Sequence, residues 1–233
     1  MTDRPRPDDH AALDNDAPLA PDRMLALLED QQREVTARTA AFVPWILAAW
    51  GIAWLVGFIV LWSDAIGHPT DAVPAPAAGL TFAALLIAAG IVSTVFGARS
   101  GRGLRGSKRA AFIGIVYGNT WWLGSMAIFT IGWALHSGGM PEALLPVFYP
   151  SAFILFAGLM YLMGGLIWNA PPMLVLGVWS VILSAVGALI PHPTAYLVYG
   201  CAGGGAFLLV GAWSAWWLHR SRRRIAALEH SRG

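Results

Sequence analysis

The chain has 233 residues, of which 57% are hydrophobic and only 12% are charged, and its formal net charge is +2. Soluble domains are about 25% charged, so this composition, arranged in long apolar runs, predicts an all-α integral membrane protein and excludes an ordinary soluble domain. The single cysteine, Cys201, excludes an intramolecular disulfide, a dithiol redox motif and a cysteine-based zinc site. The basic residues are segregated along the chain, so the small positive charge does not indicate a nucleic-acid partner.

The region before the first apolar run divides into two segments. Residues 1–22 are rich in Asp, Pro and Arg and predict a disordered acidic cytoplasmic tail. Residues 23–40 predict an amphipathic cytoplasmic helix, with Asp22 as its N-cap and Met24, Leu28 and Val35 near one face. This helix could lie on the inner membrane surface or pack on the bundle as a lead-in, and both alternatives stay open. No apolar signal-peptide core precedes it, so we expect the first apolar run to act as an uncleaved anchor.

Six apolar runs then fill residues 41–218, which we predict to form one transmembrane domain. The runs cover roughly 42–63, 77–98, 110–135, 143–168, 172–190 and 194–218, and none contains Asp, Glu, Lys or Arg. At 1.5 Å per residue, each can cross a hydrocarbon core of about 30 Å. The pattern therefore predicts a polytopic bundle of six transmembrane helices.

The basic residues predict the orientation of this bundle. All 15 Lys and Arg residues precede the first run, lie between the second and third runs, or follow the last run in the basic cytoplasmic tail 219–233. Six crossings bring all of them to one side, which the positive-inside rule identifies as the cytoplasm. We therefore predict a plasma-membrane protein with both termini cytoplasmic, whereas five or seven crossings would break this agreement.

Glycine spacing suggests that the six helices form three related hairpins. Gly51-x-x-Trp54-x-x-Gly57 matches Gly118-x-x-Trp121-x-x-Gly124 in the first and third runs. The second, fourth and sixth runs each carry two glycines seven residues apart, and GxxxG pairs occur at Gly114/Gly118 and Gly200/Gly204. Ordinary close packing of membrane helices is the alternative explanation for all of these glycines.

Neutral polar and aromatic side chains within the runs are the candidates for a substrate-binding site. We predict Asn119, Trp121 and Tyr161 as its residues. Asn119 is the most costly of them to leave unpaired in hydrocarbon, so a hydrogen bond to a neighbouring helix is the alternative role for its amide.

The connections between the runs supply two further candidate sites. The loop between the second and third runs could bind anionic lipid headgroups, or serve only to fix topology, through Arg99, Arg102, Arg105, Lys108 and Arg109. The outer connections carry imidazole and carboxylate groups of the kinds that bind zinc, but without ligand spacing such as HxxxH: Asp64, His68, Asp71, His136, Glu142 and His192. We therefore predict no metal site and no cofactor.

Three segments carry a resemblance to a known group of proteins. Residues 50–57 (Trp-Gly-Ile-Ala-Trp-Leu-Val-Gly), residues 176–179 (Leu-Gly-Val-Trp) and the stretch from Tyr196 to Gly205 resemble an uncharacterised family of small actinobacterial six-helix multi-pass membrane proteins, sometimes labelled transporter-like. The resemblance covers about residues 24–218. It implies a membrane location and six helices, and it implies no activity.

Three classes of function follow from these observations. We favour a non-catalytic binding or accessory protein in the bilayer, acting on lipid, as a homo-oligomer or with a membrane partner. A small-molecule transporter or efflux component is the alternative, although no ionisable coupling residue lies within the runs. A membrane enzyme is the least favoured class, because the runs lack His and carboxylates and the chain has no P-loop.

Overall fold

The structure is a computed structural model that describes residues 23–25, 42–67, 75–100 and 108–230. The chain divides into two compact units, Met1–Thr39 and Ala40–Gly233. In the first unit, residues 23–25 are helical, whereas the predicted tail 1–22 and the rest of the predicted amphipathic helix lie outside the described residues.

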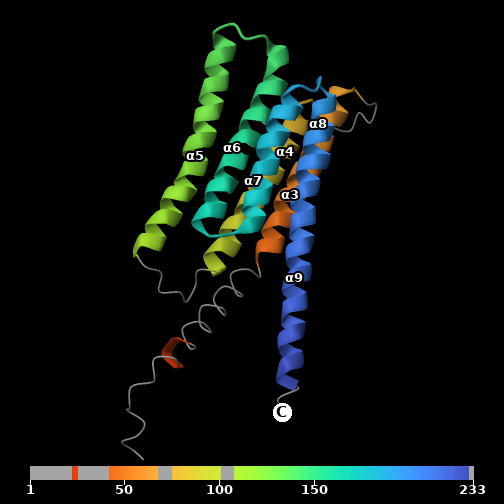
Figure 1. Ribbon diagram of the computed structural model, residues 1–233. Helices are drawn as coiled ribbons and strands as arrows, with labels where there is room; N and C mark the ends of the chain where they lie inside the picture. Colours follow the sequence, from red (N-terminus) through yellow and green to blue (C-terminus); the bar gives the residue numbers. More distant parts are fainter. Residues whose placement is uncertain (1–22, 26–41, 68–74, 101–107, 231–233) are drawn as a thin grey trace, which may run out of the picture. The chain divides into compact units, whose positions relative to one another are not determined.

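In the second unit, each of the six predicted runs is helical (Figure 1). The elements are α3 (Val43–Ala65), α4 (Ala75–Ser100), α5 (Lys108–Ser137), the 3-10 turn η2 (Glu142–Leu144), α6 (Leu145–Ile167), α7 (Pro171–Ala188), α8 (Thr194–Val198), the π-helix η3 (Tyr199–Gly204) and α9 (Gly205–His230). The last run is thus built from three consecutive helical elements. No strand occurs among the described residues, and the predicted all-α class is confirmed.

Five helical segments are long and apolar enough to span a membrane. They are Val43–Ala65, Ala77–Gly97, Glu142–Ile167, Pro171–Ala188 and Thr194–Arg220, which indicates a membrane-embedded protein. Helix α5 is long enough, with 30 residues, but it is not among the five. The centre of α5 carries the sequence Asn119-Thr120-Trp121-Trp122, which lowers its apolar character. The sixth crossing therefore remains a prediction.

Each helix packs on one or more neighbours, and α4 and α5 lie at the edges of the bundle. Helix α3 contacts α4, α8, η3 and α9, whereas α6 packs most extensively on α7, and α7 in turn contacts η3, α8 and α9. Helix α4 packs on α3, and α5 packs on α6; neither edge helix has a second extensive neighbour among the described elements (Figure 1).

Two pairs of glycines allow helix backbones to touch. A Cβ atom added to Gly204 of η3 would lie 2.8 Å from the carbonyl oxygen of Gly51 on α3, and a Cβ added to Gly51 would lie 3.0 Å from the carbonyl oxygen of Gly204. Gly158 of α6 and Gly177 of α7 form the same reciprocal arrangement, with distances of 3.0 and 2.9 Å. Since these neighbours are backbone atoms, both crossings depend on the absence of side chains.

Aromatic rings fill notches at several other glycines. The ring of Phe82 on α4 occupies the place of a side chain at Gly57 on α3; Phe156 on α6 does so at Gly124 on α5, and Tyr199 of η3 does so at Gly187 on α7. Each of these pairs joins the two helices of one predicted hairpin, whereas Trp54 of α3 fills the notch at Gly203 of η3 and joins the first hairpin to the third. The most extensive packing nevertheless joins α6 to α7, which belong to different predicted hairpins, so the three-hairpin arrangement remains a prediction.

The two GxxxG pairs have different surroundings. Gly200 and Gly204 contact α3, as predicted for close helix packing, with backbone atoms of Leu55 at 3.3 and 2.7 Å from the added Cβ atoms. No heavy atom lies within 4 Å of a Cβ added to Gly114 or Gly118 on α5. The prediction that this second pair packs closely is therefore wrong for contacts within the described chain.

Candidate functional site

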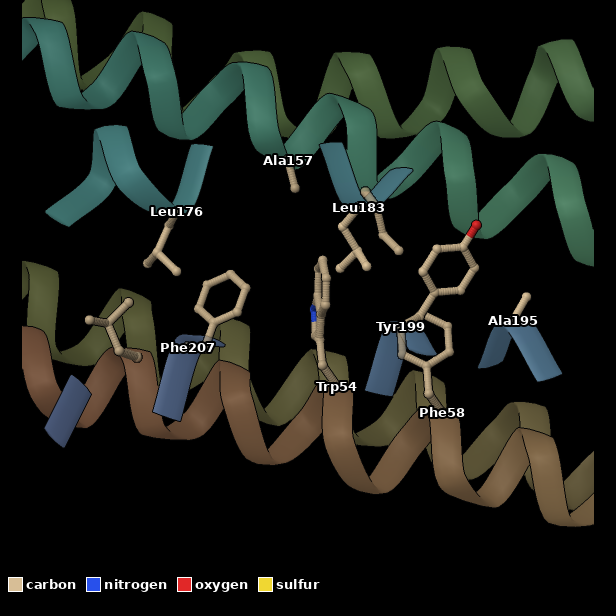
Figure 2. Packing of buried hydrophobic residues seen from close by; sticks show 10 residues of the cluster. Trp54, Phe58, Ala157, Leu176, Leu183, Ala195, Tyr199 and Phe207 are labelled. Atoms are coloured by element: carbon tan, nitrogen blue, oxygen red, sulfur yellow. The ribbon is translucent and has the colours of Figure 1, made fainter. Parts of the chain in front are cut away.

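The centre of the bundle is filled by aromatic and aliphatic side chains. Trp54 of α3 points toward Leu183 of α7, and Leu176 of α7 lies opposite Phe207 (Figure 2). The ring of Phe207 on α9 lies 5.2 Å from the Trp54 ring, and the ring of Tyr199 lies 5.5 Å from that of Phe58. These side chains form the packed scaffold of the bundle.

Polar groups inside this scaffold hydrogen-bond to one another. The hydroxyl groups of Ser151 and Tyr199 are 2.9 Å apart, and the Ser184 hydroxyl donates to the Ser151 carbonyl oxygen at 2.7 Å. Within the described residues, every buried side-chain nitrogen and oxygen atom has a partner. These bonds tie α6, α7 and η3 together.

The glycine run Gly203-Gly204-Gly205 lies in continuous helix. The π-helix η3 runs directly into α9. A π-turn frees a backbone carbonyl from the regular ladder, and Trp179 of α7 donates its indole N–H to the carbonyl oxygen of Ala202 at 2.9 Å. The glycines of η3 therefore serve packing against α3.

An apolar groove of about 180 Å³ lies on the outside of the scaffold, between α5 and α6. This volume equals that of about six water molecules at roughly 30 Å³ each, so it suits a segment of an acyl chain. Its lining is Phe112, Ile113, Val116, Tyr117 and Thr120 from α5 with Met163 and Ile167 from α6. The groove is open to the surroundings of the bundle, since Phe112 is 66% exposed.

Two hydrogen bonds satisfy the polar groups of the groove. The Thr120 hydroxyl donates to the carbonyl oxygen of Val116 within α5 at 2.8 Å, and the Tyr117 hydroxyl donates across to the carbonyl oxygen of Met160 on α6 at 3.0 Å. The ring of Trp168 packs edge-on against Tyr117, with ring centroids 4.7 Å apart. The groove thus presents an almost wholly apolar surface that Tyr117 fixes to α6.

A cationic side chain lies in line with this groove. Arg109 is exposed in the first turn of α5 and precedes Phe112 by three residues and Ile113 by four. Side chains at these spacings share one face of a helix. Lys108 is exposed beside Arg109. The apolar groove and the basic beginning of α5 together have the chemistry that would suit the acyl chain and the phosphate group of an anionic lipid.

The structure brings together two of the three predicted substrate-binding residues. The rings of Trp121 on α5 and Tyr161 on α6 pack edge-on with centroids 6.2 Å apart, and Tyr161 also contacts Phe207 at 5.4 Å. Asn119 lies elsewhere: it is exposed, and its amide donates to the Ile115 carbonyl oxygen of its own helix at 2.8 Å. A common site that includes Asn119 is therefore not formed within the chain.

Of the predicted headgroup-binding residues, Arg99, Lys108 and Arg109 are exposed at helix ends, whereas Arg102 and Arg105 lie outside the described residues. The groove residues themselves were not predicted. Their signal in the sequence is a repeated spacing of four residues. Ile113 follows Arg109 by four residues, and Phe112, Val116 and Thr120 follow one another at the same interval.

The predicted outer connections do not form a metal centre in the described part of the chain. Asp64, His136, Glu142 and His192 are exposed, and no three His, Cys, Asp or Glu side chains gather there. His136 instead lies 3.3 Å from the carbonyl oxygen of Met140, and the His192 ring packs on Tyr196. His68 and Asp71 lie outside the described residues.

Comparison with protein-family models, with curated protein sequences and with solved structures found no match to this chain.

Proposed function

We propose that this chain is a plasma-membrane protein with six crossings and cytoplasmic termini that binds an anionic phospholipid in the groove between α5 and α6 and catalyses no reaction. The observation that carries the proposal is the alignment of an apolar groove of about 180 Å³ with the exposed Arg109 at the start of the same helix face. The acyl chain would lie along Val116 and Met163, and the headgroup phosphate would lie near Arg109.

The sixth crossing is supported by the distribution of charge. If α5 crosses the membrane, all 15 Lys and Arg residues face the cytoplasm. If α5 does not cross, the arginines at positions 220–232 lie on the opposite side from those at positions 4–38. At 1.5 Å per residue, the 30 residues of α5 exceed a hydrocarbon core of about 30 Å.

The polar centre of α5 is compatible with this crossing. The side chains of Asn119, Thr120 and Thr130 each donate to a backbone carbonyl oxygen four residues earlier, which lowers the cost of carrying them into hydrocarbon. The ring-in-glycine pairs between consecutive helices likewise support an arrangement of three hairpins.

Selectivity in this groove would come from charge and fit. The hydrocarbon of the bilayer is as apolar as the groove, so burial of the acyl chain contributes little net free energy. A basic residue near the membrane surface contributes about 1 kcal/mol toward an anionic lipid, which is about fivefold in affinity. Lys108 and Arg109 together would then favour an anionic over a zwitterionic lipid by about 30-fold.

The test is lipid retention measured by native mass spectrometry, with the protein exchanged into equal amounts of phosphatidylglycerol and phosphatidylcholine. Arg109→Gln should lower the preference for phosphatidylglycerol about fivefold, because the substitution removes one charge and does not change the lining of the groove. Val116→Trp should lower retention of both lipids, because its side chain fills the groove. Ile87→Trp, on the exposed face of α4, is the matched control.

Retention by Arg109→Gln and Val116→Trp equal to that of the unchanged protein would refute lipid binding in the groove. Solute uptake by the purified protein in liposomes would instead favour the alternative of a transporter.

A further inference from the structure

Helix α5 combines two properties that seldom occur together in a membrane helix. It is the least apolar of the six predicted runs, since the other five alone qualify as membrane spans among the described residues. It is also poorly covered: of its 30 residues, all of which the structure describes, Gly132 alone is buried. Helix α4, the other edge helix, is equally uncovered but strongly apolar, as expected for a helix that faces lipid.

The polar side chain of Asn119 lies on the side of α5 that α6 does not contact. Trp121 and Gly124 meet α6, whereas Asn119 belongs to a face with Ile115, Trp122 and Met126, all of which are exposed. One amide N–H of Asn119 donates to the Ile115 carbonyl oxygen. A carboxamide has two N–H donors and an acceptor oxygen, so the larger part of its hydrogen-bonding capacity faces away from the bundle.

From this geometry we propose that a second copy of this chain packs against the Asn119 face of α5. A carboxamide both donates and accepts, so two Asn119 side chains related by a two-fold axis complete each other's hydrogen bonds. Thr130 also lies on this face, but its hydroxyl already donates to the carbonyl oxygen of Met126 and can only accept from a second copy. Gly118 lies at one edge of this face, and no heavy atom of the described chain lies within 4 Å of its Cβ position, which lets a second α5 approach there.

The lipid groove and this face adjoin on α5. Phe112 and Val116, seven and three residues before Asn119, line the groove on the side nearest this face, whereas Thr120 follows Asn119 directly and points about 100° away from it. The proposed contact therefore borders the groove at Phe112 and Val116. It rests on the proposed crossing of α5, and it does not rest on lipid binding.

Disulfide cross-linking in native membranes tests the geometry of the contact. In a Cys201→Ala background, Ile115→Cys should form cross-linked dimers under mild oxidation, because it lies on the Asn119 face. Ile113→Cys, two residues away and turned toward the groove, should not. Equal cross-linking at both positions, or none at Ile115→Cys, would overturn the proposal.

Energy transfer between labelled copies in liposomes tests the role of the amide. Asn119→Leu should weaken self-association about tenfold, as expected for the loss of interhelical hydrogen bonds in a membrane, and Asn119→Gln should retain most of it. Thr94→Val on α4, which removes an exposed hydroxyl bonded to its own helix, is the matched control. Unchanged energy transfer in Asn119→Leu contradicts the proposal.

Two further measurements keep the other proposals distinguishable. In inverted membrane vesicles, which expose the cytoplasmic face, labelling of Ile115→Cys by a membrane-impermeant maleimide would show that α5 does not cross, whereas protection from the reagent with no dimer would overturn self-association alone. Lipid retention by Asn119→Leu should equal that of the unchanged protein, since the groove is intact.

Discussion

Replacing Gly204 with alanine tests how strongly the bundle depends on the contact between α3 and η3. The added methyl group would lie 2.7 Å from the backbone nitrogen of Leu55 and 2.8 Å from the carbonyl oxygen of Gly51. Backbone atoms cannot rotate away as a side chain can, so the two helices must separate. Overpacking typically costs about 1–3 kcal/mol, and we expect the upper end, about 3 kcal/mol, which is about a 150-fold shift in the folded-to-unfolded ratio.

The assay is equilibrium unfolding in mixed detergent micelles, followed by far-ultraviolet circular dichroism. Gly90→Ala is the matched control, because it makes the same substitution in the middle of α4, where no heavy atom lies within 4 Å of the new methyl group. Its free energy of unfolding should stay within about 0.5 kcal/mol of the unchanged protein. Equal stability of the two variants would refute the reasoning that backbone contact fixes this crossing.

The same unfolding assay checks three further substitutions in the scaffold. Phe207→Ala should cost about 3–5 kcal/mol, because Phe207 is 1% exposed and its removal leaves a cavity beside Trp54; a loss below 1 kcal/mol would mean that the site collapses without cost. Ser151→Ala should cost about 1–3 kcal/mol, since it leaves the buried Tyr199 hydroxyl without its partner, and a neutral result would argue for a replacement partner. Trp179→Phe removes the hydrogen bond to the π-helix and should cost about 1 kcal/mol, with no loss at all if that bond contributes nothing.

The helices could be predicted from the sequence because the environment leaves little choice. In hydrocarbon, every backbone N–H and C=O must be satisfied within the segment, so a long apolar run without charge becomes a helix. Prolines mark the beginnings of three helices, at Pro44, Pro146 and Pro171, where their missing N–H is tolerated. The predicted runs accordingly agree with the helices of the structure, apart from shifts of a few residues and the extension of α9.

The partners of each helix face could not be predicted in the same way. A membrane helix is apolar on all sides, so periodicity does not tell which face meets a neighbour. Asn119 and Trp121 are two residues apart, and their separation around the helix decides that Trp121 packs on α6 while Asn119 faces outward. The groove beside Tyr117 depends on how the side chains of two helices fit together, and that information is absent from either run alone.

The π-helix illustrates a second limit of the sequence. Glycines at positions 203–205 are equally consistent with an unwound segment and with close packing. The role of Gly204 follows from Gly51 and Leu55 on α3, which lie about 150 residues earlier in the chain and occupy the space that a side chain would need.

The crossing of α5 is the claim on which the topology, the lipid groove and the self-association all depend. Reporter fusions after Asp71, Glu142 and His192 test it most directly, and Glu142, just beyond the end of α5, is the decisive position. We expect the reporter at Glu142 to be active outside the cell, as at the other two positions. A cytoplasmic reporter at Glu142 would contradict the six-crossing arrangement and everything inferred from it.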